Sequence, residues 1–221
     1  MSLQDELDAF KADFEAGKPP YSASKAIVEK MHRATAELQA SGAAERALKV
    51  GDKAPAFELP DSEANWVSSQ KLLAQGPLIV SFYRGVWCPY CNIELRALER
   101  ALPQLRSAGA NLIAISPQTR SNNRKSVSSN SLTFPLLSDA RNKVAADFGL
   151  VFELPDYLAD VYRAAPIDLA VFNDDPSWTL PMPARYVIGK DRVILYSEVN
   201  PDYTRRPEPE DMLSVIRRHP A

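Results

Sequence analysis

The first fifty residues carry apolar side chains at helical spacing, three or four residues apart. Two stripes have this spacing: Leu3, Leu7, Phe10 and Phe14, and then Ile27, Met31, Ala34 and Leu38. A Gly-Lys-Pro-Pro break at 17–20 separates them. The pattern predicts two helices, the second beginning at Ser22 or Ser24 and ending near Ser41. We expect an N-terminal helical arm over residues 1–49, packed on the rest of the chain or on a partner.

From residue 50 the pattern changes to short apolar runs that alternate with amphipathic stretches. Strands are predicted at 78–83, 111–116, 134–137, 185–188 and 193–196. Helices are predicted after residue 91, at 140–148 and from 209 onward. The polar stretch 121–130 fits an exposed helix or a mobile loop, and four prolines leave 151–181 unassigned. This alternation predicts an α/β domain over residues 50–221, with a mixed β-sheet flanked by helices.

Composition narrows the class of protein. The 221 residues include 26 Lys and Arg against 28 Asp and Glu, a net charge of −2, which gives no basic surface for nucleic acid or an anionic membrane. No apolar run approaches the roughly 20 residues that cross a bilayer. The acidic start MSLQDELDAF lacks the apolar core of a secretory signal. We expect a cytoplasmic protein without nucleic-acid or membrane partners.

The two cysteines, Cys88 and Cys91, form a single C-x-x-C motif just after the predicted strand 78–83. Pro89 suits the first position of a helix, so both sulfurs are expected in or just before a first helical turn. Unpaired N–H groups and the helix dipole favour an anion there, and can lower a cysteine pKa from about 8.5 to roughly 3.5–7.5. The thiolate is the nucleophile, so the motif predicts redox chemistry without help from His32 or His219, which are distant in sequence.

Three alternatives compete with this interpretation of the cysteines. A structural disulfide across a two-residue gap closes too short a loop to stabilise the fold much. A zinc site needs four ligands, and the sequence offers no second cysteine pair or closely spaced histidine pair. Two inert buried thiols are the third alternative. We favour redox chemistry carried by sulfur alone, with no metal and no cofactor.

Several further segments resemble the peroxiredoxins of the alkyl hydroperoxide reductase/thiol-specific antioxidant family. In chain order they are GDKAPAFELPD at 51–61, IVSFY at 79–83, IAIS at 113–116 and FPLLSD at 134–139. The likeness covers about residues 50–200. It implies a thioredoxin-like fold of the peroxiredoxin type, and places the chain in a CxxC-containing subgroup. It is also compatible with a homodimer, which peroxiredoxins commonly form.

The chain departs from the family at the active-site motif P-x-x-x-T/S-x-x-C. The resemblance assigns the attacking cysteine to Cys91, whereas Cys88 stands at the family threonine and Arg84 at the family proline. The family's distant arginine falls on Pro183. We therefore name Arg84 and Arg185 as the candidates for the missing cation, since Arg185 lies on the same strand face as Pro183.

The pentapeptide WCPYC at 87–91 also resembles the thioredoxin motif W-C-x-x-C. That resemblance makes Cys88 the attacking thiol and Cys91 the resolving one, and it predicts a cis bond between Met182 and Pro183 beside them. The side chains expected to support the pair are Trp87, Pro89 and Tyr90. Aromatic residues around the motif fit core packing, or an apolar rim for an organic hydroperoxide or a partner protein.

Three functions are carried forward. The first is a thiol-dependent antioxidant enzyme that reduces hydroperoxides, with Cys91 attacking, Cys88 resolving, and a thioredoxin- or glutaredoxin-type dithiol as reductant. The second is a protein disulfide oxidoreductase in which Cys88 attacks. The third is a non-catalytic redox-sensing protein that uses the arm for association.

Overall fold

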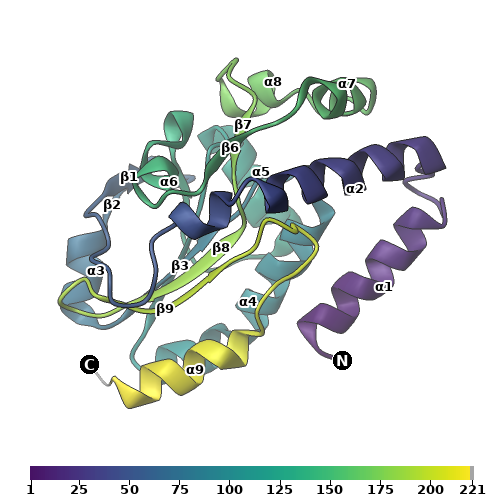
Figure 1. The fold of residues 1–221 in the computed structure, drawn as a ribbon. Coiled ribbons are helices and arrows are strands. Elements are labelled where there is room, and N and C mark those ends of the chain that lie inside the picture. Colours follow the sequence, from purple (N-terminus) through teal and green to yellow (C-terminus); the bar gives the residue numbers. More distant parts are fainter. Residues whose placement is uncertain (220–221) are drawn as a thin grey trace.

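A five-stranded mixed sheet runs through the centre of the molecule (Figure 1). Its strand order is β5-β4-β3-β8-β9. The computed structural model describes residues 1–219. The strands are β3 (Leu78–Phe82), β4 (Asn111–Ser116), β5 (Leu136–Ser138), β8 (Ala184–Ile188) and β9 (Ile194–Val199). Strand β3 pairs in parallel with β4 and antiparallel with β8, and all its residues are buried, as a central strand requires. The predicted strands and the mixed α/β architecture are confirmed.

Helices cover both faces of the sheet. The helical segments are α1 (Leu3–Glu15), α2 (Lys25–Ala40), η1 (Ala43–Arg46), α3 (Ser69–Gln75), α4 (Pro89–Ser107), α5 (Arg120–Asn130), η2 (Ala140–Asn142), α6 (Lys143–Asp147), α7 (Asp156–Ala164), α8 (Leu169–Asn173) and α9 (Pro209–Arg218). Ile79 points into a core cluster with α1, α4 and α9, whereas Leu78 and Val80 point to the opposite cluster with α3 and α6. None of the helices in the described part of the chain combines the length and apolar character needed to cross a membrane.

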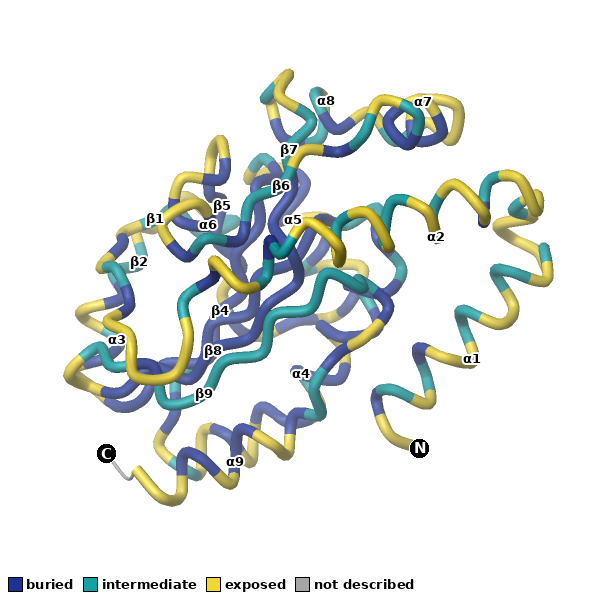
Figure 2. Tube along the Cα trace, viewed as in Figure 1, coloured by how far each residue is buried: buried dark blue, intermediate teal, exposed yellow. Residues whose placement is uncertain are grey.

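The two arm helices use their apolar stripes against the 50–221 region. Leu3 and Leu7 of α1 are buried in the cluster that holds α4 and α9. Helix α2 begins after Ser24, whose side chain caps it, and packs beside α7 through partly buried apolar residues that include Met31. Figure 2 shows that the residues along the outer faces of both helices are exposed. The predicted positions of the two arm helices are confirmed.

Two regions differ from the sequence expectation. Residues 140–148 form no single helix, because Arg141 and Asn142 have φ values of 61° and 54° and break it into η2 and α6. The unassigned stretch 151–181 holds α7 and α8 between two strands, β6 (Val151–Glu153) and β7 (Thr179–Pro181), which pair antiparallel. A smaller hairpin joins β1 (Glu58–Pro60) and β2 (Trp66–Ser68). The polar stretch 121–130 lies within helix α5.

Candidate active site

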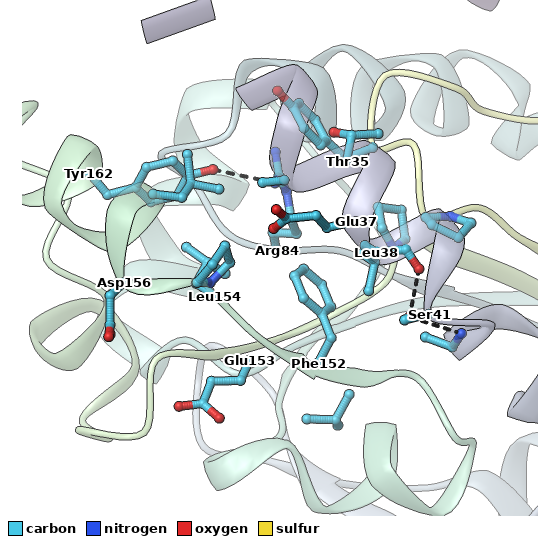
Figure 3. A pocket seen from close by; sticks show the side chains of 18 of the residues that line it. Thr35, Glu37, Leu38, Ser41, Arg84, Phe152, Glu153, Leu154, Asp156 and Tyr162 are labelled. Carbon is cyan, nitrogen blue, oxygen red and sulfur yellow. Dashed lines mark hydrogen bonds between the residues drawn. The ribbon is translucent and has the colours of Figure 1, made fainter. Parts of the chain in front are cut away.

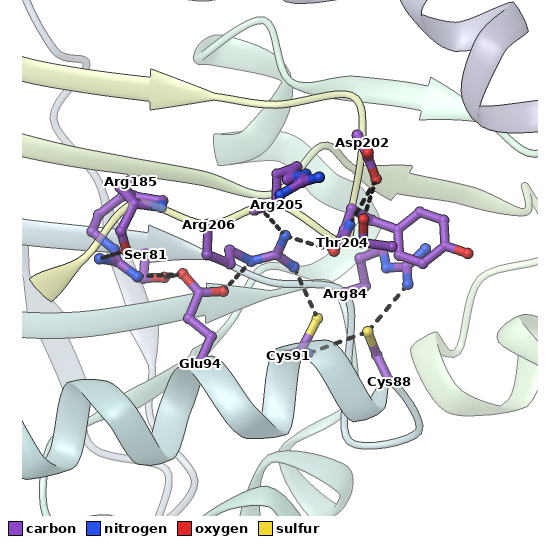
Figure 4. Close-up of polar contacts among 12 residues, drawn as sticks. Ser81, Arg84, Cys88, Cys91, Glu94, Arg185, Asp202, Thr204, Arg205 and Arg206 are labelled. Carbon is purple, nitrogen blue, oxygen red and sulfur yellow. Dashed lines mark hydrogen bonds and ion pairs between the residues drawn. The ribbon is translucent and has the colours of Figure 1, made fainter. Parts of the chain in front are cut away.

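Both cysteines lie where the central strand β3 leads into helix α4. Cys88 is the N-cap residue of α4, with extended backbone, and Pro89 occupies the first helical turn as expected. The Cys91 N–H donates a hydrogen bond to Cys88 Sγ at 3.4 Å, as Figure 4 shows. Both thiols are free and fully buried. The capping position therefore puts the Cys88 sulfur at the positive end of the α4 dipole.

Arg84 is the cation that contacts the motif directly. Its Nη2 donates to Cys88 Sγ at 3.1 Å (Figure 4). Its Nη1 lies 3.5 Å from the Tyr162 hydroxyl. The guanidinium stacks over the Tyr203 ring at 4.0 Å and lies 5.2 Å from the Trp87 ring. Arg84 is only 5% exposed, so the charge acts on the sulfur with little screening by water.

The two thiols have opposite pKa shifts. Burial alone would raise the pKa of Cys88, but the hydrogen bond from Cys91 and the charges of Arg84 and Arg206 outweigh it and lower that pKa to about 5. Burial raises the pKa of Cys91 well above its ordinary value, and the neighbouring Cys88 sulfur adds to the effect. At neutral pH the pair therefore holds its negative charge on Cys88 and its proton on Cys91.

Arg185 does not contact either sulfur. It lies fully buried on β8 and donates to Glu94 Oε1 at 2.6 Å, one helical turn beyond Cys91 on α4 (Figure 4). Glu94 also accepts a hydrogen bond from Arg206 Nε. Burial would raise the pKa of Glu94, but the charges of Arg206 and Arg185 hold it below its ordinary value. Of the two candidate cations, Arg84 contacts Cys88 and Arg185 binds Glu94.

Arg206 was missed by the sequence analysis. Its Nη2 lies 3.8 Å from Cys91 Sγ, and its Nη1 donates to the carbonyls of Tyr203 and Arg205, each at 2.7 Å. It lies on the connection between β9 and α9, more than a hundred residues after the motif. An arginine in a polar, proline-containing stretch has no local pattern that distinguishes it from an exposed one.

The aromatic residues of the motif pack against the N-terminal arm and the late connection. The Tyr90 ring meets Phe10 of α1 edge to face at 5.0 Å and Tyr203 at 5.4 Å. Trp87 meets Tyr162 of α7 at 5.4 Å. Cavities of about 500 Å³ and about 360 Å³ lie beside this cluster, and Arg84, Tyr162 and Tyr203 line both. Figure 3 shows the larger one, with Arg84 reaching into it. A small substrate in either cavity would meet the guanidinium that contacts Cys88.

Pro183 lines the larger cavity together with Arg84. The expected cis bond between Met182 and Pro183 is wrong, because within residues 1–219 only Pro19–Pro20 is cis. The Met182 N–H donates to Leu150 O at 2.8 Å, and Ala184 already pairs in the central sheet. The chain thus runs extended from β7 into β8, and a trans bond continues that path.

A buried amide holds the loop that carries the motif. The Gln118 side chain accepts from the Val86 N–H at 3.0 Å and donates to the Tyr83 hydroxyl at 2.9 Å. Gly85 has a φ of +154°, and a Cβ there would lie 2.5 Å from Trp87 Nε1, so this turn needs glycine. Among the described residues, no three His, Cys, Asp or Glu side chains come together in a way that could hold a metal ion.

Comparisons with known proteins point to one family. The model of the AhpC/TSA family matches residues 50–197. A putative peroxiredoxin of Mycobacterium tuberculosis is 36% identical over 110 residues, which cover 50% of this chain and 69% of the relative. The peroxiredoxin Bcp of Escherichia coli is 31% identical over 103 residues, covering 47% and 65%.

Solved structures confirm the thioredoxin-like, peroxiredoxin-type fold. The crystal structure of the peroxidoxin BcpB from Mycobacterium tuberculosis superposes with a TM-score of 0.62 at 24% identity, covering 79% of this chain and 99% of that one. A mutant of PrxQ from Xylella fastidiosa gives a TM-score of 0.59 at 17% identity, covering 78% and 97%.

Proposed function

Because the chain belongs to the AhpC/TSA family, we propose that it is a thiol peroxidase, an antioxidant oxidoreductase that reduces hydroperoxides through the pair Cys88 and Cys91. The family match covers the motif and the strands on both sides of it. The buried, cation-bound thiol at the start of α4 is the nucleophile that such chemistry needs.

Cys88 is the attacking thiol in this proposal, and Cys91 the resolving one. The observation that carries it is the contact of Arg84 with Cys88 Sγ at 3.1 Å, together with the hydrogen bond from the Cys91 N–H. Both interactions stabilise a thiolate at Cys88. Among the described residues, the Cys91 sulfur has no comparable pair of contacts, and the arginine that approaches it at 3.8 Å is already paired with Glu94. The family motif favours the opposite order, with Cys91 attacking.

The reaction then has two steps. The Cys88 thiolate attacks the terminal oxygen of ROOH, the O–O bond breaks, and the RO⁻ fragment takes a proton to leave as an alcohol or water while Cys88 becomes a sulfenic acid. Cys91 gives up its proton and attacks the Cys88 sulfur, which expels the hydroxyl as water and forms a disulfide. An external dithiol of the thioredoxin or glutaredoxin type returns two electrons to that disulfide. The Arg84 guanidinium donates to the oxygen that departs in the first step.

In this proposal the chain divides into two parts. Residues 50–221 form the catalytic domain in this proposal, and residues 1–49 an arm that covers the motif through Phe10 and its neighbours. A homodimer and a cytoplasmic location stay predictions.

Single substitutions of the two cysteines test the proposal. Reduced wild-type protein should consume hydrogen peroxide far faster than free cysteine. Cys88→Ser should lose that fast reaction, whereas Cys91→Ser should keep it for one turnover and accumulate a sulfenic acid that dimedone traps. If Cys91→Ser loses the fast reaction and Cys88→Ser keeps it, Cys91 attacks. A wild-type rate no better than free cysteine refutes the peroxidase.

A second candidate is a protein disulfide oxidoreductase, favoured by the low pKa of the first cysteine in WCPYC. It predicts that Cys91→Ser protein forms a stable mixed disulfide with a reducible protein such as insulin. If Cys91→Ser forms no mixed disulfide, while the wild-type protein still turns over peroxide, this candidate is excluded.

A further inference from the structure

The first turn of α1 lies against the segment 203–208, although some two hundred residues separate them in sequence. The Arg206 N–H donates to Gln4 Oε1 at 3.1 Å, and Gln4 Nε2 lies 3.3 Å from the Thr204 carbonyl. The backbone N–H groups of Leu3 and Gln4 donate to the Glu208 carboxylate at 2.9 and 3.0 Å. These bonds satisfy free N–H groups of the helix start and attach it to the late connection.

The attached segment carries two side chains into the active site. Tyr203 stacks on the Arg84 guanidinium, which contacts Cys88. The Arg206 side chain lies between Glu94 and Cys91 Sγ. The position of this short stretch of backbone therefore sets where the charge of Arg206 stands relative to Cys91.

We infer that Gln4 is a positioning residue of the active site, which acts through Arg206 on Cys91. The Gln4 side chain binds two backbone groups of the segment: it accepts from the Arg206 N–H and donates to the Thr204 carbonyl. This role rests on the proposed function, because Cys91 must lose its proton when it closes the disulfide. The N-terminal arm then contributes to the active site of the 50–221 region, because it holds Arg206 beside Cys91.

The groups that act most strongly on the Cys91 sulfur are Cys88, Arg206 and Arg84. Tyr83 and Tyr162 also lie within range of its charge. Glu94 lies behind Arg206 and is shared with Arg185. Arg84 is bound to Cys88 by its own hydrogen bond, so a small shift of the segment changes mainly the distance from Arg206 to Cys91. Arg206 also lowers the pKa of Cys88, but a thiol with a pKa of about 5 stays ionised at neutral pH after a small rise. At neutral pH the resolving step should therefore respond to Gln4, and the attacking step should not.

The substitution Gln4→Met tests this role, since methionine keeps the length and helix preference of glutamine but offers no comparable hydrogen bonds. When a single turnover with hydrogen peroxide is monitored by rapid mixing, the disulfide of Gln4→Met should close about three- to tenfold more slowly than that of wild type. The rate of sulfenic acid formation should stay within about twofold of wild type. Gln39→Met is the matched control, because Gln39 is an exposed glutamine on α2, and it should change neither rate.

An equal slowing of both steps, an unchanged closure rate, or the same slowing in Gln39→Met would overturn the inference. A second measurement stays informative if the protein has no peroxidase activity. In a Cys88→Ser background, where Cys91 is the one remaining cysteine, the pH dependence of alkylation by iodoacetamide reports the pKa of Cys91. Adding Gln4→Met should raise that pKa by about 0.5 to 1 unit. No change there rejects the positioning role independently of peroxide chemistry.

Discussion

Replacing Arg84 by methionine separates the effect of its charge from the effect of its bulk. Methionine is unbranched and apolar, so it can fill the space between the rings of Trp87, Tyr162 and Tyr203. The substitution removes the guanidinium whose Nη2 lies 3.1 Å from Cys88 Sγ. It leaves the second hydrogen bond to that sulfur, from the Cys91 N–H, in place. We expect the pKa of Cys88 to rise.

The size of the rise follows from the geometry. An opposite charge within about 4–6 Å shifts a pKa by about 1–3 units, and Arg84 is closer than that and nearly free of water. The pKa of Cys88, about 5 with the arginine present, should become about 6 to 8. At pH 6 the thiolate fraction then falls from about nine-tenths to between about one half and one hundredth.

The assay is the pH dependence of alkylation by iodoacetamide, in a Cys91→Ser background so that only Cys88 reacts. Serine keeps a hydroxyl donor beside the Cys88 sulfur. The midpoint of the profile is compared rather than the rate, because methionine also alters access to a buried sulfur. Arg33→Met is the control, because it removes an exposed arginine of arm helix α2 that lies 4.5 Å from the centre of the Tyr157 ring of α7, away from both sulfurs. Its midpoint should match that of the parent.

A midpoint that stays near 5 in the Arg84→Met protein would refute this account. The low pKa of Cys88 would then come from the helix start and the bond with Cys91 alone. A midpoint that rises equally in Arg33→Met would also refute it, since the effect would reflect net charge. Thermal unfolding of each variant establishes that the comparison is made on folded protein.

Three further predictions concern stability. Glu94→Gln leaves two buried arginines without their carboxylate, and should lower the free energy of unfolding in urea by about 3–5 kcal/mol. Cys88 has a folded pKa of about 5, below its unfolded value of about 8.5, so its thiolate stabilises the fold fully above pH 8.5 and less as the pH falls to 5. The melting temperature of reduced wild type should therefore exceed that of Cys88→Ser at pH 8.5, and the gap should shrink toward pH 5. Gly149→Ala puts a Cβ 2.6 Å from the Arg46 carbonyl at a φ of +72°, and should cost more than about 1 kcal/mol by urea unfolding.

Features that depend on neighbouring residues could be predicted from the sequence. The apolar run 78–83 and Pro89 predicted a buried strand followed by a helix, with both sulfurs in or just before the first helical turn. The structure confirms this, with Cys88 as the N-cap of α4 and Cys91 in its first turn. The Ser24 cap and the stripes of the arm were equally local. Prolines misled where they begin elements instead of breaking them, as Pro155 does at the N-cap of α7.

The electrostatic partners of the motif depended on distance in space and were predicted only in part. Alternation along the predicted strand put Arg185 on the same face as Pro183. In the structure α4 covers the face that carries Arg185, because Val187, two residues later, lies in the same core cluster as α4. Alternation cannot say which turn of the helix an arginine reaches, and Arg185 meets Glu94 instead of Cys91. Arg206 comes from an irregular connection, for which neither face nor register can be read from the sequence.

The departures from the family motif are best understood together. Where the family has a threonine, this chain has Cys88, and four residues earlier, where the family has a proline, it has Arg84, whose guanidinium contacts that new sulfur. If Cys91 attacked first, the shorter of the two arginine contacts, from Arg84 at 3.1 Å, would stabilise the wrong thiolate, and the attacking thiol would be the one whose pKa is raised. With Cys88 attacking, both changes act on the same atom, and Cys91 keeps the proton that it must release only in the second step. Arginine in place of the family proline and cysteine in place of the family threonine therefore together favour an order in which Cys88 attacks and Cys91 resolves, the reverse of the order that the family motif favours.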